Sequence, residues 1–191
     1  MKIRYLVACG LVSACMGASA ADVTMFRTSL DTAQALACFS GGCAVVTAQS
    51  GDNFTDGTMY GTISILLSNQ QGPVFFQIIN CEGPEFADAL VLNHANGNTS
   101  IKVTVAPSMP GCRGVNFLEP VTVDLVGRFD GNVHQSIDGF NTIESNTLTL
   151  RTKMREDRFT AEFQGTVGPV SGIIFNGSLA ATRNSRLEQA P

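Results

Sequence analysis

The side chains that most often act as catalytic acids and bases are scarce in this chain. It has two histidines: His94 lies in the turn-forming segment 92–97, and His134 follows the turn signal Asp130-Gly131. A serine nucleophile would need a motif such as G-x-S-x-G, and the sequence contains none. We therefore expect both histidines to be solvated loop residues, and we predict no catalytic residue and no cofactor.

Carboxylates could carry acid–base chemistry without histidine. Asp130, Asp138 and Glu144 lie close together in the sequence, and two carboxylic acids cleave glycosidic bonds when they stand roughly 5–10 Å apart. A secreted hydrolase that uses these acidic residues is our second alternative function. The chain has no Trp and few Tyr to hold a sugar ring, which argues against this alternative.

Calcium is the metal ion that fits the sequence best. The segment 51–57 gathers Asp52, Asn53 and Asp56 between glycines, and Ca²⁺ prefers carboxylate and amide oxygens. The spacing differs from that of an EF-hand loop, and the same residues are common turn formers. We expect a turn here rather than a metal site, and keep the three residues as calcium candidates.

Four cysteines follow the first twenty residues: Cys38, Cys43, Cys81 and Cys112. An even number of cysteines in an exported chain implies two disulfides, for which three pairings exist. We favour Cys38–Cys43, because residues 39–42 form a short flexible loop, and this leaves Cys81–Cys112. Zinc is disfavoured because the chain has no C-x-x-C motif and the expected compartment is oxidising.

The first twenty residues have the pattern of a secretory signal. A basic start, Met1–Arg4, precedes the apolar run Tyr5–Val12, and the small residues Ala18–Ala20 suit a signal peptidase. The run is too short to span a bilayer, which takes roughly 20 apolar residues. We predict that 1–20 is a cleaved signal peptide and that 21–191 is a single disulfide-stabilised β domain, with no transmembrane segment.

A second cleavage remains open. The segment Val12–Cys15 resembles a bacterial lipobox, in which Cys15 would become the lipidated N-terminus. We favour cleavage after Ala20, because the basic start, the apolar run and the small residues all agree with it. The expected location is therefore secreted or periplasmic, and the alternative is a lipoprotein anchored to a membrane through Cys15.

The charge balance argues against nucleic acid as a partner. Without Lys2 and Arg4 the chain has ten basic and sixteen acidic residues, a net charge of −6. The basic residues near the end of the chain are interleaved with acidic ones, so the sequence predicts no basic patch.

Alternating apolar and polar residues predict strands through most of the chain. The alternation is clear in 100–105, 121–125, 147–154 and 159–167, and we expect 155–158 to be a charged turn between the last two. Asn96-Gly97 and Asp130-Gly131 are hairpin signals, whereas Ser29–Ala37 is the one segment that could form a short helix. The fold class is all-β: a curved antiparallel β-barrel or β-sandwich of about 8–10 strands, with at most one short helix.

The pattern Phe-x-Gly-polar-aliphatic occurs three times, at 129–133, 163–167 and 175–179, and 59–63 is close to it. Positions one, three and five of a strand share a face, so each glycine should lie inside, beneath an aromatic ring or at a bend. An alternative is that the glycines leave a hollow in a barrel, as in small carrier proteins.

No family is evident in these residues. Our leading hypothesis is an exported, non-enzymatic bacterial surface or envelope protein that acts as a binding or structural interaction module for an unknown macromolecule. The first alternative is a carrier of a small hydrophobic ligand in a β-barrel cavity.

Overall fold

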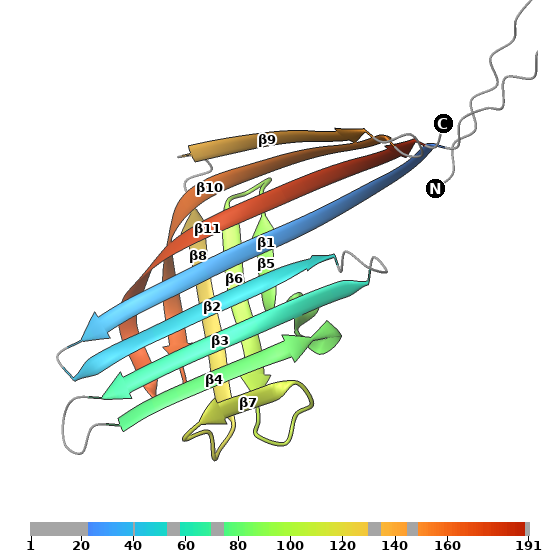
Figure 1. The fold of residues 1–191 in the computed structure, drawn as a ribbon. Coiled ribbons are helices and arrows are strands. Elements are labelled where there is room, and N and C mark those ends of the chain that lie inside the picture. The colour runs from blue at the N-terminus through green and yellow to red at the C-terminus, as the bar shows by residue number, and fades with distance from the viewer. Residues whose placement is uncertain are drawn as a thin grey trace, which may run out of the picture.

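The structure, a computed structural model, describes residues 23–39, 41–52, 58–69, 75–129, 135–144 and 149–189. They form one antiparallel sheet of eleven strands and one 3-10 helix, η1 (Figure 1). The elements are β1 (Val23–Phe39), β2 (Gly42–Asp52), β3 (Met59–Asn69), β4 (Phe75–Gly83), η1 (Pro84–Ala89), β5 (Leu90–Asn93), β6 (Asn98–Val105), β7 (Cys112–Val115), β8 (Val121–Phe129), β9 (Gln135–Glu144), β10 (Thr149–Val167) and β11 (Val170–Gln189). The expected all-β class is confirmed, with eleven strands where about 8–10 were predicted.

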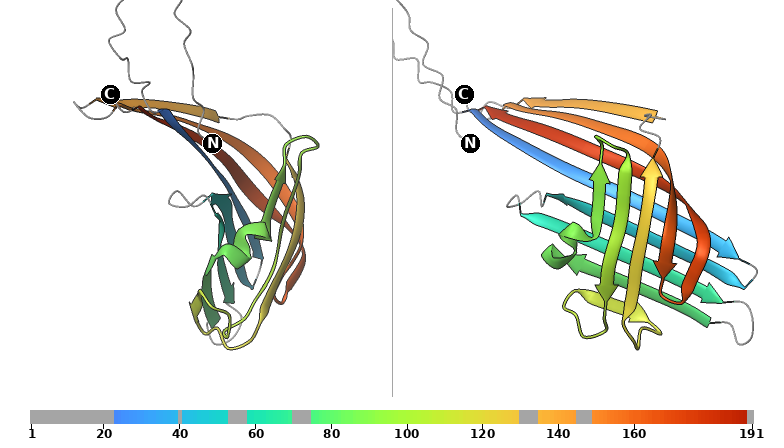
Figure 2. Two further views of the ribbon diagram at one scale, coloured as in Figure 1. Left: turned by 90° about the vertical axis from the view of Figure 1, so that its right-hand side faces the viewer. Right: turned by 180° about the vertical axis from the view of Figure 1, so that it is seen from behind.

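The sheet curls so that its two halves face each other. The strand order is β5-β6-β8-β10-β11-β1-β2-β3-β4-β7, with β9 beside β10. Strands β1 to β4 cross in front of β5, β6 and β8, and Figure 2 shows the same two layers from the side and from behind. The terminal strands β5 and β7 do not pair with each other in the described part of the chain, so the sheet is open.

Phenylalanine and aliphatic side chains fill the space between the layers. Strand β8 shows why: its residues alternate between buried and exposed along all nine positions. The largest side chains with almost no exposed surface are Phe86, Phe163, Phe175, Ile63, Ile65, Ile79, Ile101, Leu125 and Leu179. Three expected strands therefore present the faces that their alternation predicted, in 100–105, 121–125 and 159–167.

The ring of Phe163 occupies the space above two glycines on neighbouring strands. A Cβ on Gly177 would lie 2.5 Å from Cε2 of Phe163, and one on Gly127 would lie 2.7 Å from its Cδ1. The expected packing of an aromatic ring over bare backbone is confirmed at Gly177. Gly165, from another copy of the pattern, has φ 141° and lies where the β10–β11 register shifts, so it serves a bulge.

The short helix that the sequence allowed at Ser29–Ala37 does not form, because this segment lies inside β1. Ala33, Ala35 and Ala37 are all buried, and this period of two suits a strand. Strand β1 has β11 on one side and β2 on the other, so pairing at both edges overrides the helix propensity of alanine.

The charged turn expected at 155–158 is also wrong. Strand β10 runs through it without a break, and Arg155 lies opposite Arg183 of β11 and Asp138 of β9. The charges are accommodated along the strand: Arg155 pairs with Asp157 at 3.0 Å, and Arg158 pairs with Glu156 at 2.5 Å. A continuous strand also places Leu150 and Met154 on the face opposite Phe159, so they do not join its buried side.

One of the two expected hairpins forms. A turn at 94–97 joins β5 to β6, and Gly97 has φ 71°, which favours glycine. Strands β8 and β9 instead follow one another along the same edge of β10, at 161–167 and 149–158, so they are not a hairpin. Asp130-Gly131 itself lies outside the described residues.

Both preferred disulfides are present, Cys38–Cys43 and Cys81–Cys112. Each joins residues that lie directly opposite on paired strands, with Cα atoms 4.1 Å apart. The first closes the β1–β2 hairpin, and the second fastens the end strand β7 to β4. Residues 1–22, which include Cys15, lie outside the described part of the chain. Within that part, no helix is long and apolar enough to cross a membrane.

Candidate functional site

Four strands extend past the two-layered core as a single layer, which we call the projecting sheet (Figures 1 and 2). It consists of 23–30 of β1, all of β9, 149–158 of β10 and 182–189 of β11. Strand β2 pairs with β1 only from Leu30 onwards, and β8 pairs with β10 only from Ala161 onwards. Every side chain whose burial is described in the projecting sheet is exposed or half-buried.

The two faces of the projecting sheet differ in character. Because β10 is continuous, its odd-numbered residues continue the core side, and we call this the inner face. Three cations lie along β10 on the inner face: Arg151, Lys153 and Arg155. The opposite, outer face carries Leu150 and Met154.

Strand β9 forms one edge of the projecting sheet. One side of it pairs with β10 along its whole length, and no other described strand pairs with the opposite side. Its side chains are uncovered as well: Phe140 is 72% exposed and Ile143 is 55% exposed. Natural proteins usually protect exposed strand edges with lysine, proline or a bulge. The ten residues of β9 include no lysine or proline and few charges, so this edge can accept another strand.

A hollow of about 450 Å³ lies on the inner face, beside the end of β2. We call it the cationic hollow, because four of its lining residues are basic. The lining residues are Arg27, Thr28, Ser29, Asp52, Lys153, Arg155, Arg183, Asn184 and Ser185. The structure therefore brings together basic residues that lie far apart in the sequence, where no basic patch was predicted. Strand pairing between β1, β10 and β11 brings them together, and the sequence carries no signal of that pairing.

Two of these four cations have carboxylate partners on the core side of the hollow. Arg183 donates to Asp31 at 2.7 Å, and Arg155 donates to Asp157. Burial alone would raise the pKa of Asp157, but hydrogen bonds from Arg155 and Ser136 outweigh it and lower that pKa below its ordinary value.

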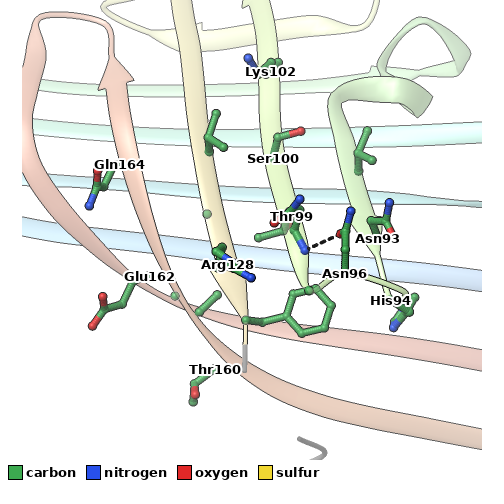
Figure 3. A pocket seen from close by; sticks show the side chains of 18 of the residues that line it. Asn93, His94, Asn96, Thr99, Ser100, Lys102, Arg128, Thr160, Glu162 and Gln164 are labelled. Atoms are coloured by element: carbon green, nitrogen blue, oxygen red, sulfur yellow. Dashed lines mark hydrogen bonds between the residues drawn. The ribbon is translucent and has the colours of Figure 1, made fainter. Parts of the chain in front are cut away.

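A larger hollow of about 1450 Å³ lies over β5, β6, β8, β10 and β11, and we call it the polar hollow. Figure 3 shows amide and hydroxyl side chains around it, with Lys102 and Arg128 as its basic groups. Its outward residues come from adjacent strands: Asn98 lies opposite Arg128, which lies opposite Glu162. Lys102 is neutralised by Asp124 at 3.0 Å, and the amides can donate and accept hydrogen bonds, so this surface suits a neutral polar ligand.

At the polar hollow, the imidazole ring of His94 packs against aromatic side chains, and the hydroxyl of Thr99 is buried. The ring of His94 rests against Phe129 and Phe159, with ring centroids 5.9 and 5.8 Å away. His94 thus lies in a turn, as expected, but its ring packs on two aromatic side chains. Thr99 is 2% exposed, and its hydroxyl has no hydrogen-bond partner among the described residues.

The acidic candidates from the sequence do not gather in the part of the chain that is described. Asp138 and Glu144 lie six residues apart on β9, which places them about 20 Å from each other, well beyond the roughly 5–10 Å of a glycosidase pair. Asp52 accepts hydrogen bonds from the backbone and hydroxyl of Ser29, at 2.8 and 3.1 Å. No group of three metal-binding side chains occurs among the described residues, and Asn53, Asp56, Asp130 and His134 lie outside them.

A row of apolar side chains crosses the outer surface of the front layer. Successive pairing partners on β1, β2, β3, β4 and β7 form this row: Leu36, Val45, Leu66, Ile78 and Val115. Leu36 and Val115, at its two ends, are 43% and 55% exposed. The row is a second uncovered surface, distinct from the β9 edge.

Comparison with known proteins gives no relative for this chain: no protein-family model, no curated protein and no solved structure matches it.

Proposed function

We propose that this chain is an exported, non-enzymatic bacterial surface or envelope protein, and that it works as a structural module that joins to a second copy of itself. The observation that carries the proposal is the edge of β9 in the projecting sheet that pairs with no other described strand. A single layer without buried side chains gains stability when a partner extends it, because backbone groups at the edge then find hydrogen bonds.

The sequence of β9 is complementary to itself in an antiparallel arrangement. A two-fold axis through Phe140, perpendicular to the sheet, would pair β9 with β9 of the second copy and keep equivalent faces on one side. No like charges would then meet, and apolar residues would face one another. The pairs are Phe140 with Phe140, Ile137 with Ile143, Gly139 with Asn141, Asp138 with Thr142, and Ser136 with Glu144.

This register can be tested by crosslinking. In a Phe140→Cys variant the two new thiols would lie directly opposite each other, where Cα separations of about 4.5–5.5 Å suit a disulfide. We expect a covalent dimer on mild oxidation, seen by non-reducing electrophoresis and intact mass. A Leu118→Cys variant is the matched control, because Leu118 is 86% exposed and lies outside the sheet.

Introducing like charges at the contact gives a second, non-covalent test. Phe140→Lys places two ammonium groups opposite each other across the two-fold axis and should shift the protein to monomer in sedimentation velocity, whereas Leu118→Lys should not. A wild-type protein that is monomeric at high concentration, or equal crosslinking by the two cysteine variants, would contradict the proposal.

Export is the other half of the proposal. Two disulfides support an oxidising compartment, and the signal pattern in 1–20 supports cleavage after Ala20. The intact mass of the protein recovered from the producing cell distinguishes the two forms. A chain that begins at Ala21 fits the secreted or periplasmic form, and a diacylated chain that begins at Cys15 would show the lipoprotein instead.

A further inference from the structure

We infer that the cationic hollow is a binding site for an extended polymer that carries phosphate or sulfate groups. This inference does not depend on self-association, because the residues that line the hollow come from β1, β2, β10 and β11, whereas the proposed contact is made by β9.

The arrangement of the cations follows from the strand register. Lys153 lies opposite Ser185, and Ser185 lies opposite Arg27 on the far side, so one hydroxyl stands between two cations. Neighbouring strands are about 4.8 Å apart, which puts the Cα atoms of Lys153 and Arg27 about 10 Å from each other. An oxyanion above Ser185 could therefore accept hydrogen bonds from both side chains and from the hydroxyl group.

Two residues closer to the core along β10, two more cations lie on the same face. Arg155 lies directly opposite Arg183, an arrangement that disfavours the folded sheet unless anions are near. Asp157 and Asp31 supply negative charge on the core side of this pair. Lys153 and Arg27, farther from the core, form no ion pair among the described residues, so their positive charge is available to a ligand.

Carboxylates around the hollow offset part of its positive charge. Asp52 faces it from β2 and is held by Ser29, while Asp138 lies opposite Arg155 on β9. The cations also continue outward on the same face to Arg151, so Arg151, Lys153 and Arg155 follow β10 at alternate positions, about 7 Å apart. A line of cations at such a spacing suits a chain of anionic groups better than one small ion, because each group can meet a separate cation.

The probe for this site is long-chain polyphosphate, with dextran sulfate as a second arm that separates phosphate from sulfate preference. We expect binding to weaken as salt rises, because a polyanion releases counterions when cations replace them. The double variant Arg27→Gln/Lys153→Gln should bind about tenfold or more weakly and should reduce the slope of log affinity against log salt by about 1 for each charge removed.

The matched control is the double variant Lys102→Gln/Arg128→Gln, which also removes two surface cations, from the polar hollow on another part of the sheet. It should retain wild-type affinity. Circular dichroism of each variant checks that the fold is kept. Three results would overturn the inference: equal loss in the Lys102→Gln/Arg128→Gln control, unchanged binding in Arg27→Gln/Lys153→Gln, or equal affinity for orthophosphate and polyphosphate.

Discussion

At the scale of single residues, the core includes contacts that are too close to accommodate an added methyl group. Phe163 is fully buried, and its ring fills the space that the bare backbone of Gly127 and Gly177 leaves on the strands at either side. The period of two along β10 placed this ring inside from sequence alone. The two glycines beneath it could be assigned only in part, because Gly127 belongs to no copy of the Phe-x-Gly pattern.

Gly177→Ala should destabilise the protein by about 1–3 kcal/mol, because its methyl group would overlap the Phe163 ring and the backbone oxygen of Gln34. The check is the free energy of unfolding in urea. Gly139→Ala is the control, since its Cβ would meet the nearest atom, Cε of Met154, at an ordinary 3.6 Å. Similar free energies for the two variants would show that the space beneath Phe163 is not tight.

Thr99→Val should be neutral or raise the free energy of unfolding by about 1 kcal/mol. The threonine hydroxyl is buried without a hydrogen-bond partner in the described part of the chain, and such a group costs stability that an isosteric methyl does not. Thr99→Ser keeps the hydroxyl and loses the methyl, so it should be the less stable of the two. A strongly destabilised Thr99→Val would mean that the hydroxyl has a partner, such as a bound water.

The lowered pKa of Asp157 makes the ion pair on β10 sensitive to acid. A carboxyl whose folded pKa lies below its unfolded value stabilises the fold above the unfolded pKa of about 3.9, and this stabilisation is lost as pH falls through the folded pKa. NMR titration should therefore give Asp157 a midpoint below the ordinary aspartate value. Arg155→Gln should move that midpoint upward, and an unmoved midpoint would assign the shift to another group.

At the scale of elements, local sequence predicted strands well and their extent poorly. Alternation identified the buried faces of β8 and the second half of β10, and the Asn96-Gly97 signal marked the β5–β6 turn. Local sequence failed where pairing with strands distant in the sequence determines the conformation. The alanine-rich part of β1 and the charged middle of β10 are strands because neighbouring strands pair with them on both sides. The cationic hollow was missed for the same reason, since its residues come from β1, β10 and β11.

The two disulfides should differ in their contribution to stability. Cys81 and Cys112 are 31 residues apart, whereas Cys38 and Cys43 are 5 apart, and a longer closed loop removes more entropy from the unfolded chain. Replacing Cys81 and Cys112 with alanine should lower the free energy of unfolding by about 4 kcal/mol, and replacing Cys38 and Cys43 should lower it by about 2 kcal/mol. Equal losses would indicate that strain or residual structure outweighs loop length.

At the scale of the whole molecule, stability should be uneven. The two-layered core holds all of the buried side chains described, and the projecting sheet holds none. Backbone amides should therefore exchange with solvent faster in 149–156 than in 159–167 of the same strand. Hydrogen exchange followed by mass spectrometry checks this in the monomeric Phe140→Lys variant. Equal protection in the two segments would mean that the projecting sheet is as stable as the core.

Three strands, β1, β10 and β11, run from the core into the projecting sheet without a break. Their backbone hydrogen bonds lie across the strand direction. A pull along the strands would load many of these bonds at once in shear, rather than peel them apart one after another. The projection should therefore transmit force as a stiff lever, and a mechanical load applied at its tip would reach the disulfide-fastened body with little stretching in between.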